Sequence, residues 1–295
     1  MTYVTARDGT RLHVEEDGTG TPILFIHEFA GDHRSWEPQV SHFRARNRCI
    51  VYAARGYPPS DVPKELDAYS QQHAVEDALA VLDGVGIERA HVVGLSMGGF
   101  CALHLGLQSP ERTISLVVAG CGYGAAPDSQ DRFRRESTAI AEAFRTDGAA
   151  QVAPRYAVGP TRVQLQNHNP DAWERFVAQL AEHDSTGAAL TMLGVQTRRP
   201  SLYAMRDELA ALHVPTLILV GDEDDGAIDA SVMMKRTIPS AGLAVLPRTG
   251  HTINLERPAI FNRTIEEFLD AVANGEWSER DPRSLSSSIT GIDDD

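Results

Sequence analysis

The sequence of 295 residues predicts an α/β protein built on a doubly wound, mostly parallel β-sheet. Short apolar runs recur along the chain without the polar alternation of a half-exposed strand, which is expected where helices cover both faces of a sheet. Helical patterns separate these runs, and such alternation of strand and helix is typical of parallel sheets with crossover connections. The fold class follows from these two observations together.

The chain begins with a pattern typical of a β-hairpin. Two predicted strands, residues 3–6 and 12–15, flank the turn residues Asp8, Gly9 and Thr10. An Asp-Gly pair between two strands favours a tight antiparallel connection. We therefore expect the otherwise parallel sheet to start with an antiparallel hairpin.

Six apolar runs and four helical patterns make up the rest of the predicted core. The runs are residues 23–26, 49–52, 91–94, 114–118, 217–220 and 243–246, and each is too continuous for a half-exposed strand. The helical patterns are residues 70–82, 97–107, 229–237 and 258–272. We therefore predict one α/β core formed by residues 1–121 and 213–277.

The alternation of strand and helix breaks between residues 122 and 212. Helical patterns cover residues 131–145 and 171–183, but no convincing strand occurs in this stretch. We interpret residues 122–212 as a helical insertion between two strands of the sheet. Residues 278–295 turn polar, with runs of Ser and Asp, and predict a disordered tail.

Charge and composition exclude several kinds of partner. Asp and Glu number 41 against 27 Lys and Arg, giving a net charge of −14 without a basic stripe, so nucleic acid is a poor partner. No apolar run approaches the roughly 20 residues of a membrane helix, and the first residues lack a secretory signal. The three cysteines lie in apolar stretches without metal-ligand spacing, which indicates reduced thiols and a cytoplasmic protein. We expect a small-molecule substrate, no metal and no cofactor, and we leave a homodimer open.

A candidate nucleophile lies where the third apolar run meets a helix. Residues 94–98 read Gly-Leu-Ser-Met-Gly, which places Ser96 in the G-x-S-x-G spacing. A sharp strand-to-helix turn lifts such a serine out of the sheet, and Gly94 and Gly98 remove side chains that would collide across the turn. The alternative is a small-residue packing turn with an incidental serine. The strand before and the helix after favour the nucleophile.

A serine nucleophile needs a base, and the base needs a carboxylate to orient it. His251 follows the last apolar run, and Asp224 follows the run before it. Asp222, Glu223 and Asp225 are rivals for the carboxylate. The candidates lie after the carboxyl ends of predicted strands, where open parallel sheets place their sites.

With these residues, the chain resembles the α/β-hydrolase fold family over about residues 5–273. The family uses the chain order Ser, Asp, His, and its acid is commonly the fourth residue of a G-x-x-D run. Residues 221–224 match that run and favour Asp224. The resemblance also implies an oxyanion hole formed by the backbone N–H groups of Phe29 and Met97, and a helical cap over the nucleophile.

One residue departs from the family pattern. Where the family usually has His-Gly-x, this chain has His27-Glu28-Phe29. A carboxylate beside an oxyanion hole opposes negative charge unless it is paired. Arg55 follows the next strand, so we expect a Glu28–Arg55 ion pair that braces the loop. A Glu28 that faces the substrate or positions water is the alternative.

The insertion supplies candidate pocket residues, although packing within the insertion also explains each of them. These residues are Tyr123, Tyr156, Trp173, Phe176, Met192 and Tyr203, together with Arg155, Arg198 and Arg199 as partners for a substrate carboxylate. We take Glu28, Tyr123 and Trp173 as candidate substrate-binding residues.

The sequence therefore predicts a serine hydrolase that cleaves a carboxylic ester or lactone of a small molecule through an acyl-enzyme. Three other functions stay open because one fold supports many chemistries. They are hydrolysis of a carbon–carbon bond in a diketone, a hydrolase-like ligand receptor, and a cofactor-free oxygenase. Relatives that hydrolyse haloalkanes or epoxides use an Asp nucleophile, and Ser96 argues against those reactions.

Overall fold

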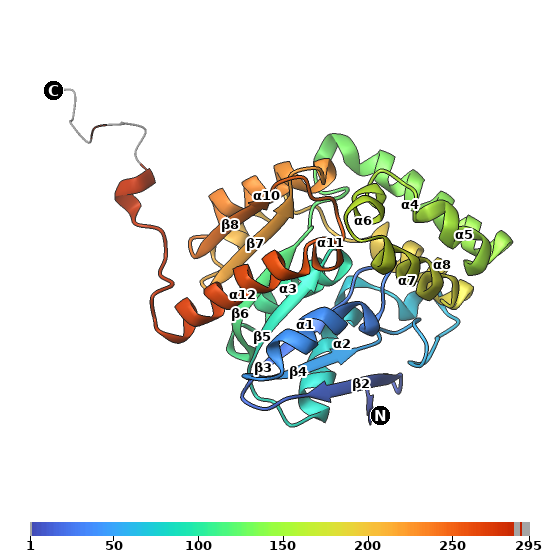
Figure 1. Ribbon diagram of the computed structural model, residues 1–295, viewed down its shortest axis with the longest axis horizontal. Coiled ribbons are helices and arrows are strands. Elements are labelled where there is room, and N and C mark those ends of the chain that lie inside the picture. Colours follow the sequence, from blue (N-terminus) through green and yellow to red (C-terminus); the bar gives the residue numbers. More distant parts are fainter. Residues whose placement is uncertain (1, 286–289, 291–295) are drawn as a thin grey trace.

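The computed structural model describes residues 2–285 and residue 290, and it shows a central sheet flanked by helices (Figure 1). The described residues form one eight-stranded sheet in the order β1-β2-β4-β3-β5-β6-β7-β8. The strands are β1 Thr2–Thr5, β2 Arg11–Asp17, β3 Thr21–Ile26, β4 Asn47–Tyr52, β5 Ala90–Leu95, β6 Thr113–Ala119, β7 Thr216–Gly221 and β8 Ala241–Leu246. The pairs β1–β2 and β2–β4 are antiparallel, and the remaining pairs are parallel. The predicted fold class, including its antiparallel start, is confirmed.

Helices cover both faces of this sheet, as the continuous apolar strands predicted. The flanking helices are α1 Glu37–Phe43, α2 Gln71–Gly84, α3 Met97–Gln108, α10 Asp225–Thr237, α11 Ile253–Glu256 and α12 Pro258–Ala273. On one face, α2, α3 and α10 pack against strand residues such as Leu24 and Ile26. On the other face, α1 and α12 pack against Ile23 and Phe25. Successive residues of one strand therefore enter opposite cores, which leaves no polar side to the strand.

Residues 122–212 contain helices and, among the described residues, no strand. The helices are α4 Pro127–Asp147, α5 Ala149–Tyr156, α6 Val163–His168, α7 Pro170–Ala181, α8 Ser185–Thr191, the π-helical turn η4 Met192–Gln196 and α9 Arg206–Ala210. Figure 1 shows α4–α8 gathered at one end of the sheet. A third apolar cluster joins these helices to Phe29, Tyr57 and Met97, which lie in segments that follow β3, β4 and β5. The insertion therefore rests on the carboxyl ends of the central strands.

Four short 3-10 helices complete the described chain: η1 His33–Trp36, η2 Leu66–Ala68, η3 Pro110–Arg112 and η5 Pro282–Leu285. The predicted disordered tail, residues 278–295, therefore begins with a segment that includes η5. Residues 286–289 and 291–295 lie outside the described residues. No helix in the described part of the chain has both the length and the apolar character needed to span a bilayer.

Candidate active site

Ser96 lies in a strained turn between β5 and α3. Its backbone has φ 54° and ψ −112°, a conformation that L-residues rarely adopt. A Cβ atom added to Gly94 would lie 2.0 Å from the carbonyl oxygen of Gly98, and one added to Gly98 would lie 2.0 Å from that of Ile26. Both glycines are therefore required by close backbone contacts. The half-buried Ser96 side chain lies at the amino end of α3, where the helix dipole favours developing negative charge.

Asp224 and His251 form a buried pair at the ends of the two neighbouring strands β7 and β8. His251 Nδ1 lies 2.8 Å from Asp224 Oδ2, and the two residues are 4% and 0% exposed. The three rival carboxylates, Asp222, Glu223 and Asp225, are exposed, and none of them contacts His251 among the described residues. The geometry therefore places Asp224 alone where it can orient the imidazole.

The end of β6 brings Ser96 and His251 close to each other. The Ser96 N–H donates to the carbonyl oxygen of Ala119 at 2.8 Å. A Cβ atom on the next residue, Gly120, would lie 3.4 Å from Nδ1 and Cε1 of His251. The described residues show no hydrogen bond between Ser96 Oγ and His251, and such bonds often tighten only once substrate is bound.

The loop that carries His251 is held by a carboxylate that the sequence analysis did not single out. Glu256 accepts hydrogen bonds from the N–H groups of Gly250, at 2.7 Å, and Thr252, at 2.9 Å. Glu256 thus binds the backbone on both sides of His251. Burial raises the pKa of Glu256 above its ordinary value, although the two N–H groups act in the opposite direction. An acidic residue five positions after the histidine was the only sequence signal for this role.

The candidate oxyanion donors lie on either side of the Ser96 turn. Met97 begins α3, so its N–H has no acceptor within the helix. Phe29 follows β3, and its carbonyl oxygen accepts a hydrogen bond from the Tyr57 hydroxyl at 2.9 Å. The Phe29 ring packs edge-on against Phe144 of α4, with ring centres 5.8 Å apart. In the described part of the chain no hydrogen bond occupies the Phe29 N–H, so both donors are free.

The predicted Glu28–Arg55 ion pair is wrong. Arg55 turns away toward α2, where Nε and Nη2 each lie 2.7 Å from the carboxylate of Asp77. Arg55 Nη1 also lies 2.8 Å from Asp8. Glu28 pairs instead with Arg162 of the insertion, which donates from Nη1 to Oε1 at 3.0 Å and from Nη2 to Oε2. Arg55 was expected because its loop follows the strand next to that of Glu28. The actual partner, Arg162, lies 134 residues away in the sequence.

Arg162 connects the two loops that carry the candidate catalytic groups. Besides Glu28, its Nη1 donates to Thr252 Oγ1 at 2.8 Å. Glu28 directly precedes Phe29, and Thr252 directly follows His251. The guanidinium also lies near the rings of Tyr156 and Phe176, whose centres are 5.5 and 5.2 Å away. Burial is the largest single influence and would lower the pKa of Arg162, but the charges and hydrogen bonds of Glu28 and Tyr156 together raise it, so Arg162 stays charged.

Two aromatic residues proposed for the pocket have different surroundings. The ring of Tyr123 meets the His251 ring edge-on, with centres 5.3 Å apart. Burial and the Asp224 charge raise the pKa of Tyr123, so its hydroxyl stays protonated. Trp173 Nε1 donates to the carbonyl oxygen of Ala157 at 2.8 Å, a contact within the insertion. Tyr123 is therefore adjacent to the site, whereas substrate binding by Trp173 stays a prediction.

Arg199 is the one of the three candidate arginines that is buried near the site. Its guanidinium lies 3.8 Å from the ring centre of Phe100 and 4.7 Å from that of Phe133. It donates to the Tyr123 carbonyl oxygen and to Gln196. Burial lowers the pKa of Arg199 to about 10. Arg199 therefore fixes the backbone of Tyr123, next to His251.

Comparison with known proteins agrees with this fold. The family described as alpha/beta hydrolase fold matches residues 21–258, so the chain belongs to the α/β-hydrolase fold family and is a hydrolase. It is similar to 3-oxoadipate enol-lactonase 1 of Acinetobacter baylyi, with 28% identity over 272 residues that cover 91% of this chain and 97% of that enzyme. The 2-hydroxymuconate semialdehyde hydrolase of Pseudomonas putida is 28% identical over 280 residues, which cover 88% of this chain and 91% of that enzyme.

A solved structure extends this similarity to three dimensions. The fold matches a thermophilic esterase from Thermogutta terrifontis with a TM-score of 0.80 and 28% identity. The match covers 92% of this chain and 98% of the esterase.

Proposed function

We propose that the protein is a serine hydrolase that cleaves a carboxylic ester or lactone of a small molecule through an acyl-enzyme. The proposal depends on one observation: the strained Ser96 turn lies beside a buried Asp224–His251 pair at the same edge of the sheet. A nucleophile, a base and an orienting carboxylate are thereby available in the chain order of the family. The enol-lactonase and esterase relatives support this substrate class.

In the proposed mechanism, Ser96 Oγ attacks the substrate carbonyl carbon while His251 Nε2 takes its proton. Asp224 holds the Nδ1–H of the imidazole and stabilises the imidazolium that forms. The N–H groups of Phe29 and Met97 stabilise the oxyanion of the tetrahedral intermediate. His251 then gives the proton to the leaving alkoxide. Water, activated by the same histidine, releases the acid and regenerates Ser96.

We also infer that residues 122–212 act as a cap that shapes the substrate pocket. Arg162 joins this segment to Glu28 and Thr252, and Arg199 joins it to the Tyr123 backbone beside His251. A cavity of about 30 Å³ next to Met97 is lined mainly by apolar side chains of the core and of this segment.

Labelling with a fluorophosphonate tests the nucleophile. Wild-type protein should be labelled once, at Ser96, because among the serines that the structure describes only Ser96 has both a strained turn and an imidazole beside it. Ser96→Ala should not be labelled. Persistent labelling of Ser96→Ala, located by peptide mass spectrometry, would assign the nucleophile elsewhere.

Activity profiling tests the substrate class. p-Nitrophenyl acyl esters, lactones and diketones are compared at one enzyme concentration, with Ser96→Ala as the blank. We expect Ser96-dependent turnover of an ester or a lactone. Turnover of diketones alone would move the reaction to a carbon–carbon bond. Ligand binding without turnover would indicate a receptor, and oxygen consumption would indicate an oxygenase.

A further inference from the structure

Two histidines and a glutamate form a cluster outside the proposed active site. His13 and Glu15 are two positions apart on β2, so their side chains point to the same face of the sheet. His33 begins η1, in the segment that follows β3. One ligand atom from each of the three residues lies within 4.8 Å of the others. In the sheet, β4 and β3 separate β2 from β5, the strand that leads to Ser96.

The Nε2 atoms of both histidines lie toward Glu15, and their Nδ1 atoms make no hydrogen bond. Glu15 Oε1 lies 2.9 Å from His13 Nε2 and 3.6 Å from His33 Nε2, so only the first distance is a hydrogen bond. The His13 and His33 side chains are 1% and 7% exposed, and the Nδ1 atoms of both have no hydrogen-bond partner.

The spacing suits a metal ion. Ligand atoms of a tetrahedral zinc ion lie about 3.3–3.6 Å from one another, as follows from bond lengths of about 2.0–2.2 Å. The 3.6 Å between Glu15 Oε1 and His33 Nε2 fits this range, whereas the 2.9 Å between Glu15 Oε1 and His13 Nε2 is shorter, so Glu15 must shift to bind an ion. Glu15 is 46% exposed, so its side chain can adjust without disturbing the core.

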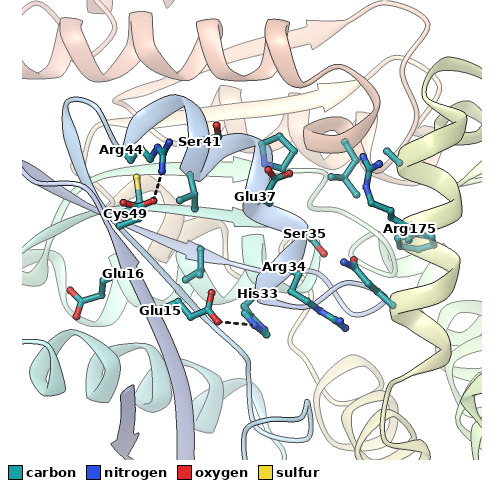
Figure 2. Close-up of a pocket in the computed structure, with 18 residues that line it drawn as sticks. Glu15, Glu16, His33, Arg34, Ser35, Glu37, Ser41, Arg44, Cys49 and Arg175 are labelled. Carbon is teal, nitrogen blue, oxygen red and sulfur yellow. Dashed lines mark hydrogen bonds and ion pairs between the residues drawn. The ribbon is translucent and has the colours of Figure 1, made fainter. Parts of the chain in front are cut away.

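The surroundings add a coordination position that is open to solvent. Glu15 and His33 line a cavity of about 640 Å³, and Figure 2 shows their side chains pointing toward each other in it. Asp32 Oδ1 lies 3.7 Å from His33 Nδ1, the nitrogen that is not directed at Glu15, which is close but beyond hydrogen-bond distance.

We propose that His13, Glu15 and His33 bind one divalent first-row transition ion, with Zn²⁺ as the preferred test ion and water as the fourth ligand. Two imidazoles and one carboxylate form a donor set that suits Zn²⁺ and Co²⁺ rather than Mg²⁺ or Ca²⁺. The ion ties β2 to the segment after β3, which also carries Glu28 and Phe29. The site is independent of the Ser96 chemistry.

Isothermal titration of the chelator-treated full chain with zinc chloride tests this proposal. We expect one equivalent to bind and to raise Tm, and Co²⁺ to give a visible absorption band of a four-coordinate site. Glu15→Gln and His33→Gln should each weaken binding by about tenfold or more, because each removes one ligand. Glu16→Gln is the matched control, since this neighbouring carboxylate pairs with Arg48 instead.

Two results would overturn the proposal. One is the absence of zinc binding to wild-type protein at micromolar concentration. The other is binding that is unchanged in Glu15→Gln and His33→Gln, which would locate the metal at a different site. Circular dichroism of each variant establishes that it is folded, and the exposed Glu15 makes Glu15→Gln the safer of the two.

Discussion

At Ser96 the chain holds a non-glycine residue in a conformation that costs about 1–3 kcal/mol. The cost is tolerated because the backbone on both sides is fixed by Gly94, by Gly98 and by the hydrogen bond from the Ser96 N–H to Ala119. Such strain aims the hydroxyl before substrate arrives. The sequence pattern predicted this residue because only glycine fits the two flanking positions.

The Asp224–His251 contact gives a prediction at the scale of one residue. Asp224→Asn should lower kcat by about 10⁴-fold, because the amide neither stabilises the imidazolium nor enforces the required tautomer. The measurement is kcat on the best ester or lactone found by profiling. Asp222→Asn is the matched control and should retain activity near wild type, since Asp222 is exposed and contacts Thr249. If Asp222→Asn lost activity while Asp224→Asn kept it, Asp222 would instead be the carboxylate that orients His251.

At the scale of elements, the central strands could be predicted because both of their faces are buried. Leu24 and Phe25 enter different cores, so an unbroken apolar run is the pattern that this location requires. The helices near residues 131–145 and 171–183 could be predicted from their apolar periodicity. The helices α5, α6 and α8 were missed because they are short and are stabilised by packing within the insertion.

The partner of Glu28 could not be predicted in this way. Arg162 and Glu28 meet only when the insertion folds back onto the loop after β3, and no local pattern encodes that contact. The His13, Glu15 and His33 cluster was missed for the same reason, because β2 and η1 are brought together by the sheet order. Local signals identify elements, whereas contacts between distant elements come from the tertiary fold.

The Glu28–Arg162 pair gives a prediction about how the insertion is joined to the core. Arg162→Met should lower the free energy of unfolding by about 3–5 kcal/mol, because it leaves the Glu28 carboxylate buried without a partner. Glu28→Gln should cost stability for the converse reason. The double variant should cost less than the sum of the two, since neither charge then remains unpaired. Urea unfolding of the three variants measures this coupling.

Kinetics of the same variants test whether Arg162 positions the active site. Loss of Arg162 should reduce kcat more than it changes KM, because Phe29 and His251 lie next to the two residues that it binds. Arg162→Lys should restore stability in part, but it cannot reproduce the paired contacts with Glu28 and Thr252. If Arg162→Met is folded and its kcat is unchanged, Arg162 stabilises the fold but does not position the active site.

At the scale of the whole molecule, several histidines are buried at a cost in acid stability. Burial lowers the pKa of His91, His104 and His183 to about 4 each. They lie in β5, in α3 and just after α7, so both the core and the insertion contain such a group. None of the three pairs with a carboxylate at hydrogen-bond distance in the described part of the chain.

These histidines predict how stability depends on pH. Their pKa is lower in the folded protein than the value of 6.5 in an unfolded chain, so the unfolded chain binds more protons between about pH 6.5 and pH 4. The contribution of these buried neutral histidines to the free energy of unfolding is complete above pH 6.5, and it is lost as the pH falls toward 4. His104→Leu removes one such group. The variant should therefore lose less of its free energy of unfolding as the pH falls, by at most about 3 kcal/mol. Urea unfolding at pH 7.5, 6, 5 and 4.5 measures the effect, and parallel curves for wild type and variant would contradict it.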